Sequence, residues 1–217
     1  IYDSEDNEIQ TLSSAGANRM YVTVDQIPKN LQHAFIAIED ERFYEHNGID
    51  MKGILRAASV ALTNGQLSQG ASTITQQLLK NNVFNAYNES TIEKIKRKVQ
   101  EQYLAVKLET VMSKDSILEN YLNTINLGNG YYGVQAAAKG YFNKDVSELT
   151  ISECAVIASI TKSPTGLNPI RYPEKNKPRQ NQVLLNMKDQ GYITQAEYDE
   201  AMADDVYARL EGIELAG

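Results

Sequence analysis

From Pro28 onward, the apolar residues of this chain recur at the spacing of an α-helix, and this periodicity constrains the fold more than any other feature of the sequence. Leu31, Ala34, Phe35 and Ile38 stand at positions i, i+3, i+4 and i+7, which places them on one face of a helix. Similar patterns, with start and stop residues at their ends, predict further helices at 54–62, from Ser72 or Thr73, from 90–91, and at 115–123, 134–142, 151–160, 179–190 and 194–203. The chain is therefore predicted to be mainly α-helical.

The segments outside this pattern are short. The first 27 residues are polar and contain two β-like stretches, near 1–2 and 20–24. Four of the five prolines lie between residues 164 and 178, which predicts an extended but ordered loop. The helix that follows Ser90 is expected to be long, with Glu93 completing a capping box and an apolar stripe of the kind that packs against a core: Ile92, Ile95, Val99, Tyr103 and Val106.

Composition narrows the class of protein. The chain has 217 residues, enough for one large or two small domains, and 42% of them are hydrophobic, which argues against intrinsic disorder. The net charge is −7, so no nucleic-acid partner is expected; residues 188–217 alone hold eight acidic against two basic residues. No apolar run reaches the roughly 18 residues of a membrane span. Because the chain does not begin with Met, we expect a piece of a longer protein with an upstream membrane anchor.

The first candidate for chemistry is the run from Glu39 to Gly48. If the first helix continues, Glu39, Phe43 and His46 share one face, and Gly48 ends the helix. A carboxylate beside an apolar stripe is a candidate general base. The alternative interpretation is a charged helix end at the surface, in which His46 is a hydrogen-bonded structural residue.

The second candidate is the run from Gln69 to Lys80. On a helix, Thr73, Gln77 and Lys80 lie on one face, and Ser72 and Gln76 lie on the adjacent one. This density of neutral donors near a helix start, with a lysine one turn later, suits a phosphate or a sugar. The spacing is not that of a P-loop. The alternative is a Ser/Thr cap followed by solvated amides.

The third candidate places Lys94, Arg97, Lys98 and Glu101 on one helical face, opposite the apolar stripe. Such a face can seat a diphosphate, with a carboxylate at its rim. The alternative is an exposed Arg97–Glu101 ion pair of about 0.3–0.5 kcal/mol. Two distant histidines and the lack of a clustered Asp/Asn loop argue against a zinc site or a calcium loop.

Together these runs resemble the motifs of the peptidoglycan glycosyltransferase domain of penicillin-binding proteins and monofunctional glycosyltransferases. The similar segments are Glu39-Asp40-x-x-Phe43-x-x-His46-x-Gly48, Gly70-x-Ser72-Thr73-Ile74-Thr75-Gln76-Gln77, Arg97-Lys98-x-x-Glu101 and Ile117-Leu118-Glu119-x-Tyr121-Leu122-Asn123. The resemblance covers about residues 28–190 in family order. It departs from the family pattern at two places. The fifth motif keeps Arg179 but has Gln180 in place of a second arginine, and the loop 81–90 lacks an expected arginine, for which Lys94 and Arg97 are candidate substitutes.

The resemblance implies a lysozyme-like, two-lobed α-helical fold around a long cleft. Residues 1–27 would be a β-like linker after an anchor, 28–203 the glycosyltransferase domain, and 204–217 an acidic tail. Residues 49–70 would form a membrane-facing lobe, with lipid contacts from Ile54, Leu55, Val60 and Leu62. The location implied is the outer face of the bacterial cytoplasmic membrane, with an N-terminal transmembrane helix as anchor.

The reaction implied by the resemblance is the polymerisation of lipid II into glycan strands. A growing chain on undecaprenyl diphosphate is the donor, the 4-hydroxyl of the GlcNAc of lipid II is the acceptor, and the anomeric configuration inverts. The implied partners beyond lipid II and the membrane are a C-terminal transpeptidase domain and other cell-wall synthesis proteins, and the inhibitor moenomycin would block the donor site. The alternatives are a lysozyme-like glycan hydrolase and an inactive domain that binds lipid II as a scaffold.

The implied roles divide the candidate residues into two groups. Glu39 would be the base, and Glu101 the second catalytic carboxylate, which could share a divalent cation (Mg²⁺ or Mn²⁺) with the diphosphate. The cationic residues would stabilise the departing diphosphate, and the others would orient sugar or phosphate. The predicted substrate-binding residues are Asp40, Phe43, His46, Ser72, Thr73, Gln76, Gln77, Lys80, Arg97, Lys98, Asn123 and Arg179.

Overall fold

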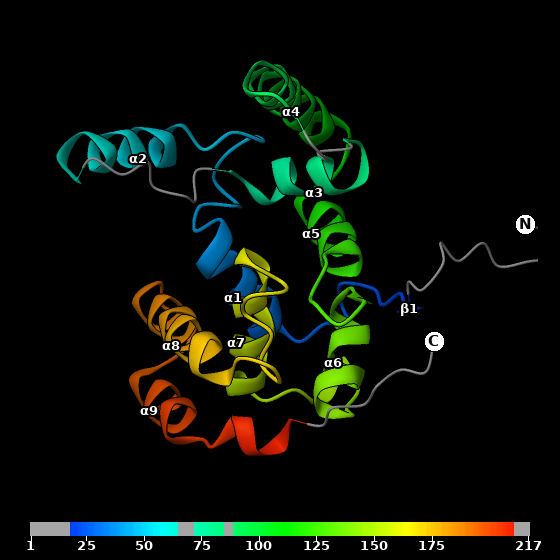
Figure 1. Cartoon of the computed structure of the whole chain (residues 1–217), viewed down its shortest axis with the longest axis vertical. Coiled ribbons are helices and arrows are strands. Elements are labelled where there is room, and N and C mark those ends of the chain that lie inside the picture. The colour runs from blue at the N-terminus through cyan, green and yellow to red at the C-terminus, as the bar shows by residue number, and fades with distance from the viewer. Residues whose placement is uncertain (1–17, 65–71, 85–88, 211–217) are drawn as a thin grey trace, which may run out of the picture.

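The structure, a computed structural model, describes residues 18–64, 72–84 and 89–210. Its lower part packs α1 (Lys29–Glu39) against α7 (Ile151–Ser159) and α8 (Pro173–Asp189), with α9 (Gln195–Ala203) outside them and α6 (Val134–Phe142) beside them (Figure 1). Its upper part holds α2 (Met51–Asn64), α3 (Ile74–Asn82) and α4 (Thr91–Val111), and α5 (Lys114–Thr124) packs against α3. The predicted mainly α fold is confirmed.

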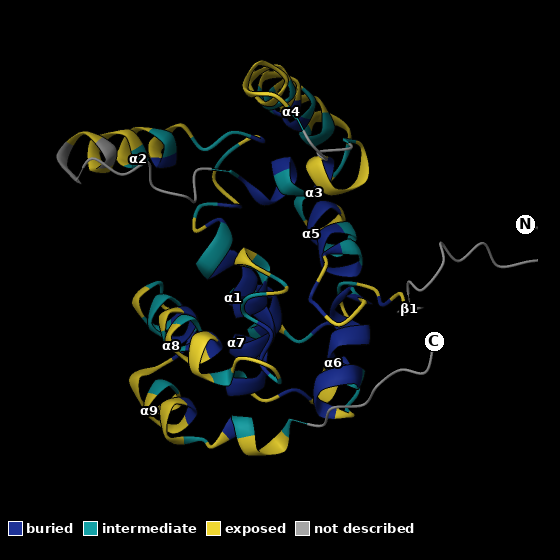
Figure 2. Ribbon diagram, in the orientation of Figure 1, coloured by how far each residue is buried: buried dark blue, intermediate teal, exposed yellow. Residues whose placement is uncertain are grey.

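The hydrophobic core lies in the lower part and continues into α5 and α3. Leu31, Ala34 and Phe35 of the apolar stripe of α1 are fully buried there and Ile38 is half-buried, and α7 is buried along nearly its whole length (Figure 2). Ser90, Thr150 and Thr194 each form the predicted kind of capping box, with a glutamate at the third helical position. The helix boundaries therefore follow from local sequence in most of the chain.

The β content is smaller than the sequence indicates and lies elsewhere. Strand β1 (Asn18–Arg19) pairs in parallel with β2 (Tyr131–Tyr132), from a distant part of the chain. The β-like stretch 20–24 forms no strand, and residues 1–2 lie outside the described part. Short 3-10 helices complete the fold: η1 (Val146–Glu148), η2 (Ile160–Lys162) and η3 (Val206–Arg209).

The proline-rich segment 164–178 is not a loop over its whole length, because its last residues are helical. Helix α8 begins at Pro173, where a proline is favourable because the first helical N–H has no partner, and it continues through Pro178. Pro178 has no N–H, so one helical hydrogen bond is lost there. The buried face of α8 offsets this loss: Asn176 donates to the Leu167 carbonyl at 2.8 Å, and Val183 and Leu184 lie in the core. Tertiary packing therefore overrides the local preference against helix.

The exposure of one apolar stripe and the burial of Val206 contradict two further predictions. The apolar stripe of α4 is exposed: Ile92, Ile95 and Val99 each keep about three fifths of their surface, because α4 turns the face with Glu101 and Ala105 inward (Figure 2). The segment 204–210 is expected to start an acidic tail, but residues 206–209 form η3, and Val206 is buried in the core. The folded unit therefore continues to Leu210, and residues 211–217 lie outside the described part.

Candidate active site

Glu39, the last residue of α1, faces a cleft of about 480 Å³ between the two parts of the molecule. The cleft is walled by residues from α3, α4 and η2 and by the segment after α5. Its lining comprises Glu39, Ser72, Gln76, Gln77, Lys80, Asn81, Lys98, Glu101, Ile125, Asn126, Thr161, Lys162 and Pro164. Residues from all three candidate runs of the sequence therefore meet in one cavity.

The Glu39 carboxylate is held by donors from three separate elements. Gln77 on α3 donates from Nε2 to Oε2 at 2.9 Å. Thr161 on η2 donates from Oγ1 to Oε1 at 2.6 Å, and Arg179 on α8 donates from a guanidinium nitrogen to the same oxygen at 3.1 Å. The Glu39 side chain keeps 14% of its surface exposed, toward the cleft. It is thus an oriented carboxylate in a cavity and not a charged helix end on the outer surface.

The side chains around Lys98 form a cationic part of the same cleft lining. The Lys98 ammonium donates to Ser72 Oγ at 2.7 Å, to Gln76 Oε1 at 3.2 Å and to Glu101 Oε2 at 3.2 Å. Glu101 is buried, with only 1% of its side chain exposed, and its other oxygen accepts a hydrogen bond from Arg97. The predicted alternative of a solvated Arg97–Glu101 surface pair is therefore wrong, because the carboxylate is removed from water.

Arg97 is fixed behind this part of the lining. Its Nε donates to both oxygens of Glu89, at 2.8 and 2.9 Å, while another guanidinium nitrogen reaches Glu101. Burial alone would lower the pKa of Arg97, but the hydrogen bonds and charges of Glu89 and Glu101 outweigh it and raise the pKa above its usual value. Arg97 does not line the cleft, so it supports Glu101 and Lys98 from outside it.

Two other lysines line the cleft with exposed side chains. Lys80 stands in the last turn of α3 and Lys162 ends η2. Within the described parts of the chain, neither ammonium forms an ion pair. A multiply charged anion in the cleft could therefore meet Lys80, Lys98 and Lys162 without first displacing a carboxylate from Lys80 or Lys162.

Four predicted substrate-binding residues form the frame of the site instead of its surface. The buried Asp40 carboxylate accepts from the backbone N–H of Ile74 at 2.9 Å and contacts His46 Nε2 at 2.9 Å. Thr73 caps α3 and donates to the Gly48 carbonyl at 2.8 Å. Phe43 has no exposed surface and lies in the core. None of these four lines the cleft; Asp40 and Thr73 border a smaller cavity of about 110 Å³ beside it.

Asn123 is likewise not brought to the cleft. Its amide pairs with both backbone groups of Val22, accepting from the N–H at 2.9 Å and donating to the carbonyl at 2.8 Å, and it is buried. It therefore fastens the N-terminal segment to α5. The prediction that Asn123 binds substrate finds no support in this position.

Sequence reasoning missed Thr161, Lys162 and Asn126. Thr161 lies 122 residues from Glu39, so no local pattern links the two. A threonine at the end of a buried helix gives no signal of its own. The packing of α7 against α1 brings Thr161 and Lys162 to the cleft, and Asn126 reaches it from the segment after α5.

The residues around Glu101 do not fit a protein-held divalent cation. Such ions need several oxygen ligands, whereas Glu101 is a single carboxylate flanked by two cationic side chains. The described residues contain no group of three or more His, Cys, Asp or Glu side chains that could hold a metal. We therefore derive no step of the chemistry through a metal.

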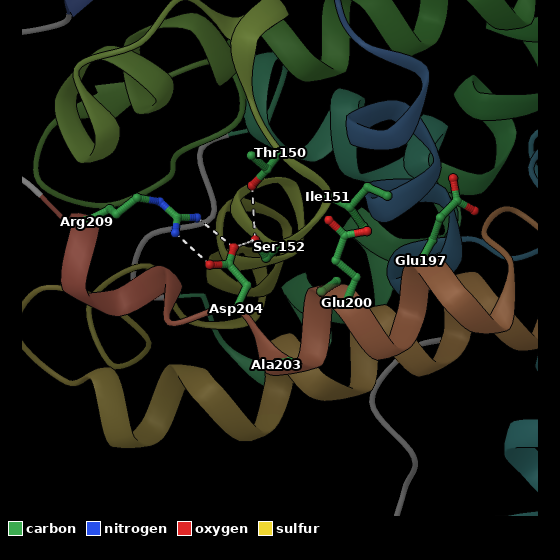
Figure 3. Close-up of a pocket in the computed structure, with 9 residues that line it drawn as sticks. Thr150, Ile151, Ser152, Glu197, Glu200, Ala203, Asp204 and Arg209 are labelled. Atoms are coloured by element: carbon green, nitrogen blue, oxygen red, sulfur yellow. Dashed lines mark hydrogen bonds and ion pairs between the residues drawn. The ribbon is translucent and has the colours of Figure 1, made fainter.

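A second pocket, of about 660 Å³, opens between the start of α7, α9 and η3 (Figure 3). Two of its charged side chains pair with each other: Asp204 accepts from Arg209 at 2.6 and 2.7 Å, and it also accepts from Ser152. The hydrogen bonds from Arg209 hold the pKa of Asp204 below its usual value. None of the predicted site residues lines this pocket, so we place the candidate active site in the cleft at Glu39.

The chain is similar to known proteins of one family. The family model for transglycosylases matches residues 5–188. Penicillin-binding protein 1A of Escherichia coli is 50% identical over 198 residues, which are 91% of this chain and 23% of that protein. Penicillin-binding protein 1F of Bacillus subtilis is 46% identical, over 91% of this chain and 27% of that protein. The crystal structure of penicillin-binding protein 1A from Haemophilus influenzae aligns with a TM-score of 0.53 at 28% identity, covering 87% of this chain and 18% of that one. The chain thus spans about a quarter of the length of these curated relatives.

The contact between Gly48 and α4 generates a stability prediction. Gly48 has a φ of +88°, and a Cβ there would lie 2.6 Å from the Ala105 backbone. Gly191 has a similar φ of +77° but no neighbour within 4 Å, so it is a matched control for backbone strain alone. We expect Gly191→Ala to lower the free energy of unfolding by about 1–2 kcal/mol, and Gly48→Ala by about 3–5 kcal/mol. Denaturant unfolding measures both values, and equal costs would contradict the close contact between the two segments.

Proposed function

Because the chain belongs to the transglycosylase family, we propose that it polymerises lipid II into glycan strands, by inverting transfer from a glycan on undecaprenyl diphosphate to the GlcNAc 4-hydroxyl of lipid II. The observation that carries this proposal is that one cleft holds both an oriented carboxylate and a set of cations. Glu39 presents the carboxylate, and the cationic side chains are led by Lys98. Inverting displacement needs a base on one side of the reacting carbon and charge stabilisation on the other.

The acceptor hydroxyl is a weak nucleophile without a base. Glu39 takes its proton while the oxygen forms a bond to the anomeric carbon of the donor. The bond from that carbon to the diphosphate oxygen breaks at the same time, and the diphosphate leaves with the electron pair. The attacking and leaving groups lie on opposite faces of the sugar ring, so the configuration at the anomeric carbon inverts.

The leaving group determines what the cations of the cleft must do. A diphosphate is a stable anion, so it needs cations to stabilise its developing charge more than it needs an acid. Lys98, Lys80 and Lys162 line the cleft for this purpose. Glu101 and Arg97 then act on Lys98: the buried carboxylate holds the ammonium toward the cleft, next to Ser72 and Gln76.

A glycan hydrolase is the less favoured alternative. A lysozyme-like enzyme would use Glu39 as an acid and release a neutral sugar hydroxyl, for which a cluster of cations has no use. An inactive scaffold that only binds lipid II would not need an oriented carboxylate with donors on both oxygens. The carboxylate and the cations together therefore favour transfer from a diphosphate.

The membrane surface is the proposed location of this reaction, through α2. Leu55 and Leu62 on this helix are 67% and 88% exposed, and Met51 is 60% exposed. A helix with exposed apolar residues of this size can lie in the interface of a bilayer. Within the described residues, no helix is long and apolar enough to cross a membrane. Residues 65–70 of the predicted membrane-facing lobe lie outside the described part.

The relatives suggest what the whole protein contains. Their printed names describe penicillin-binding proteins, and this chain matches only about a quarter of their length. We therefore propose that the domain works in a protein that also carries a penicillin-reactive transpeptidase domain, at the outer face of the bacterial cytoplasmic membrane.

Replacing the proposed base tests the chemistry directly. Glu39→Gln keeps the shape of the side chain but cannot accept a proton, so we expect the rate of lipid II polymerisation to fall by about 100-fold or more. Glu200→Gln is the matched control, because Glu200 lines the second pocket and has an exposed side chain. It should keep the wild-type rate. Thermal unfolding checks that both variants are folded.

Retained polymerisation by folded Glu39→Gln would overturn the assignment of the base. A loss of activity in Glu200→Gln would move the site to the second pocket.

The membrane proposal is tested by co-sedimentation with anionic phospholipid vesicles. The double variant Leu55→Ser/Leu62→Ser should bind vesicles more weakly, by roughly tenfold per leucine, because each serine loses apolar surface that the bilayer would bury. Met202→Ser on α9 is the control, since Met202 is an exposed apolar residue at the far end of the molecule. Equal binding by the double variant and the control would show that α2 makes no lipid contact.

A further inference from the structure

The arrangement around Glu39 identifies which of its two oxygens is free to act. Oε1 accepts from Thr161 and from Arg179, and Oε2 accepts only from Gln77 among the described residues. A carboxylate oxygen has two in-plane lone pairs, so a carboxylate offers about four acceptor positions. Three of them are occupied here. The remaining position is on Oε2.

We propose that Thr161 is a positioning residue, which with Arg179 occupies Oε1 so that the proton of the incoming sugar hydroxyl goes to Oε2 of Glu39. This inference rests on the proposed function, and it adds a residue that no sequence motif identified. The bond that breaks is the O–H of the acceptor, and the proton forms a bond to Oε2. Oε1 becomes the carbonyl oxygen of the acid and still accepts from both donors, so neither side chain has to move.

The location of Thr161 makes it suited to this role. It belongs to η2, which continues α7, and α7 packs against α1, the helix that ends at Glu39. The position of the hydroxyl is therefore set by two buried helices and not by a loop. Thr161 Oγ1 also lies 3.0 Å from the Ala158 carbonyl, but a hydroxyl has one proton to donate. The shorter contact, at 2.6 Å to a charged acceptor, takes it.

The donor on the other oxygen is fixed as well. Tyr121 donates from its hydroxyl to Gln77 Oε1 at 3.1 Å, which turns the amide nitrogen of Gln77 toward Glu39. Burial, with the negative charges of Glu39 and Asp40, raises the pKa of Tyr121 well above its usual value, so this hydroxyl keeps its proton. Gln77 thus approaches Oε2 from a set direction, and the second lone pair of Oε2 has no donor among the described residues.

The test compares Thr161→Val, which removes the hydroxyl at similar size, with Thr161→Ser, which keeps it. Polymerisation of lipid II is measured over a range of concentrations. We expect Thr161→Val to lower kcat by about 10- to 100-fold with KM nearly unchanged, because it removes one charge-assisted hydrogen bond from the base and no contact with substrate. Thr161→Ser should restore most of kcat.

Thr110 supplies the matched control. Its hydroxyl donates to a backbone carbonyl three residues earlier, at 2.7 Å, as Thr161 could do, but Thr110 is exposed at the end of α4 and outside the cleft. Thr110→Val should keep the wild-type kcat and KM. Thr161→Ala replaces Thr161→Val if the valine variant does not fold.

A second readout needs no turnover. In ¹³C NMR of the glutamate carboxyl carbons, the Glu39 signal is identified by its loss in Glu39→Gln. It should shift or broaden in Thr161→Val and return to its wild-type position in Thr161→Ser. If the wild-type chain fails to lengthen lipid II, the proposed function is wrong, and this spectrum alone then decides the role of Thr161.

Three kinetic results would overturn the proposal. They are a wild-type kcat in Thr161→Val, an equal loss in Thr161→Ser, which would assign the effect to packing, and a rise in KM without a change in kcat. An unchanged Glu39 signal in Thr161→Val would also contradict it.

Discussion

The rest of the site depends on the hydrogen bonds of one buried carboxylate, that of Asp40. It follows Glu39 directly, accepts from the N–H of Ile74 at the start of α3, and pairs with His46. This one group therefore joins the end of α1, the start of α3 and the turn that ends at Gly48. Because the Gly48 carbonyl accepts from Thr73 and Gly48 itself lies against α4, the same turn also connects α1 to α3 and α4, whose residues line the cleft. A buried carboxylate with several donors is costly to disturb, which makes it an effective anchor.

This anchor explains why the motif residues have different roles. Glu39, Gln77 and Lys98 present polar atoms to the cleft, whereas Asp40, His46, Thr73 and Phe43 keep those atoms in place. A base must be held within hydrogen-bond reach of its proton, and a cation must face the charge that develops. Both demands require rigid support, so many residues of each motif have a structural role.

The sequence predicts well what depends on neighbours along the chain. The helix of Leu31, Ala34 and Phe35 and the capping box at Ser90 are read from spacing alone, and both occur in the structure. Thr161 could not be found in this way, because its partner is 122 residues distant and only the packing of α7 against α1 brings the two together. The exposure of Ile92 and Ile95 was mispredicted for a related reason: periodicity finds an apolar stripe but not what covers it.

The central claim is that a carboxylate and a set of cations act across one cleft to transfer sugar from a diphosphate. The most direct test is to incubate the purified chain separately with lipid II and with finished glycan, and to measure the product lengths by gel electrophoresis. The account predicts longer strands from lipid II, release of undecaprenyl diphosphate, and no change in finished glycan. Shortening of finished glycan, with no product from lipid II, would contradict it.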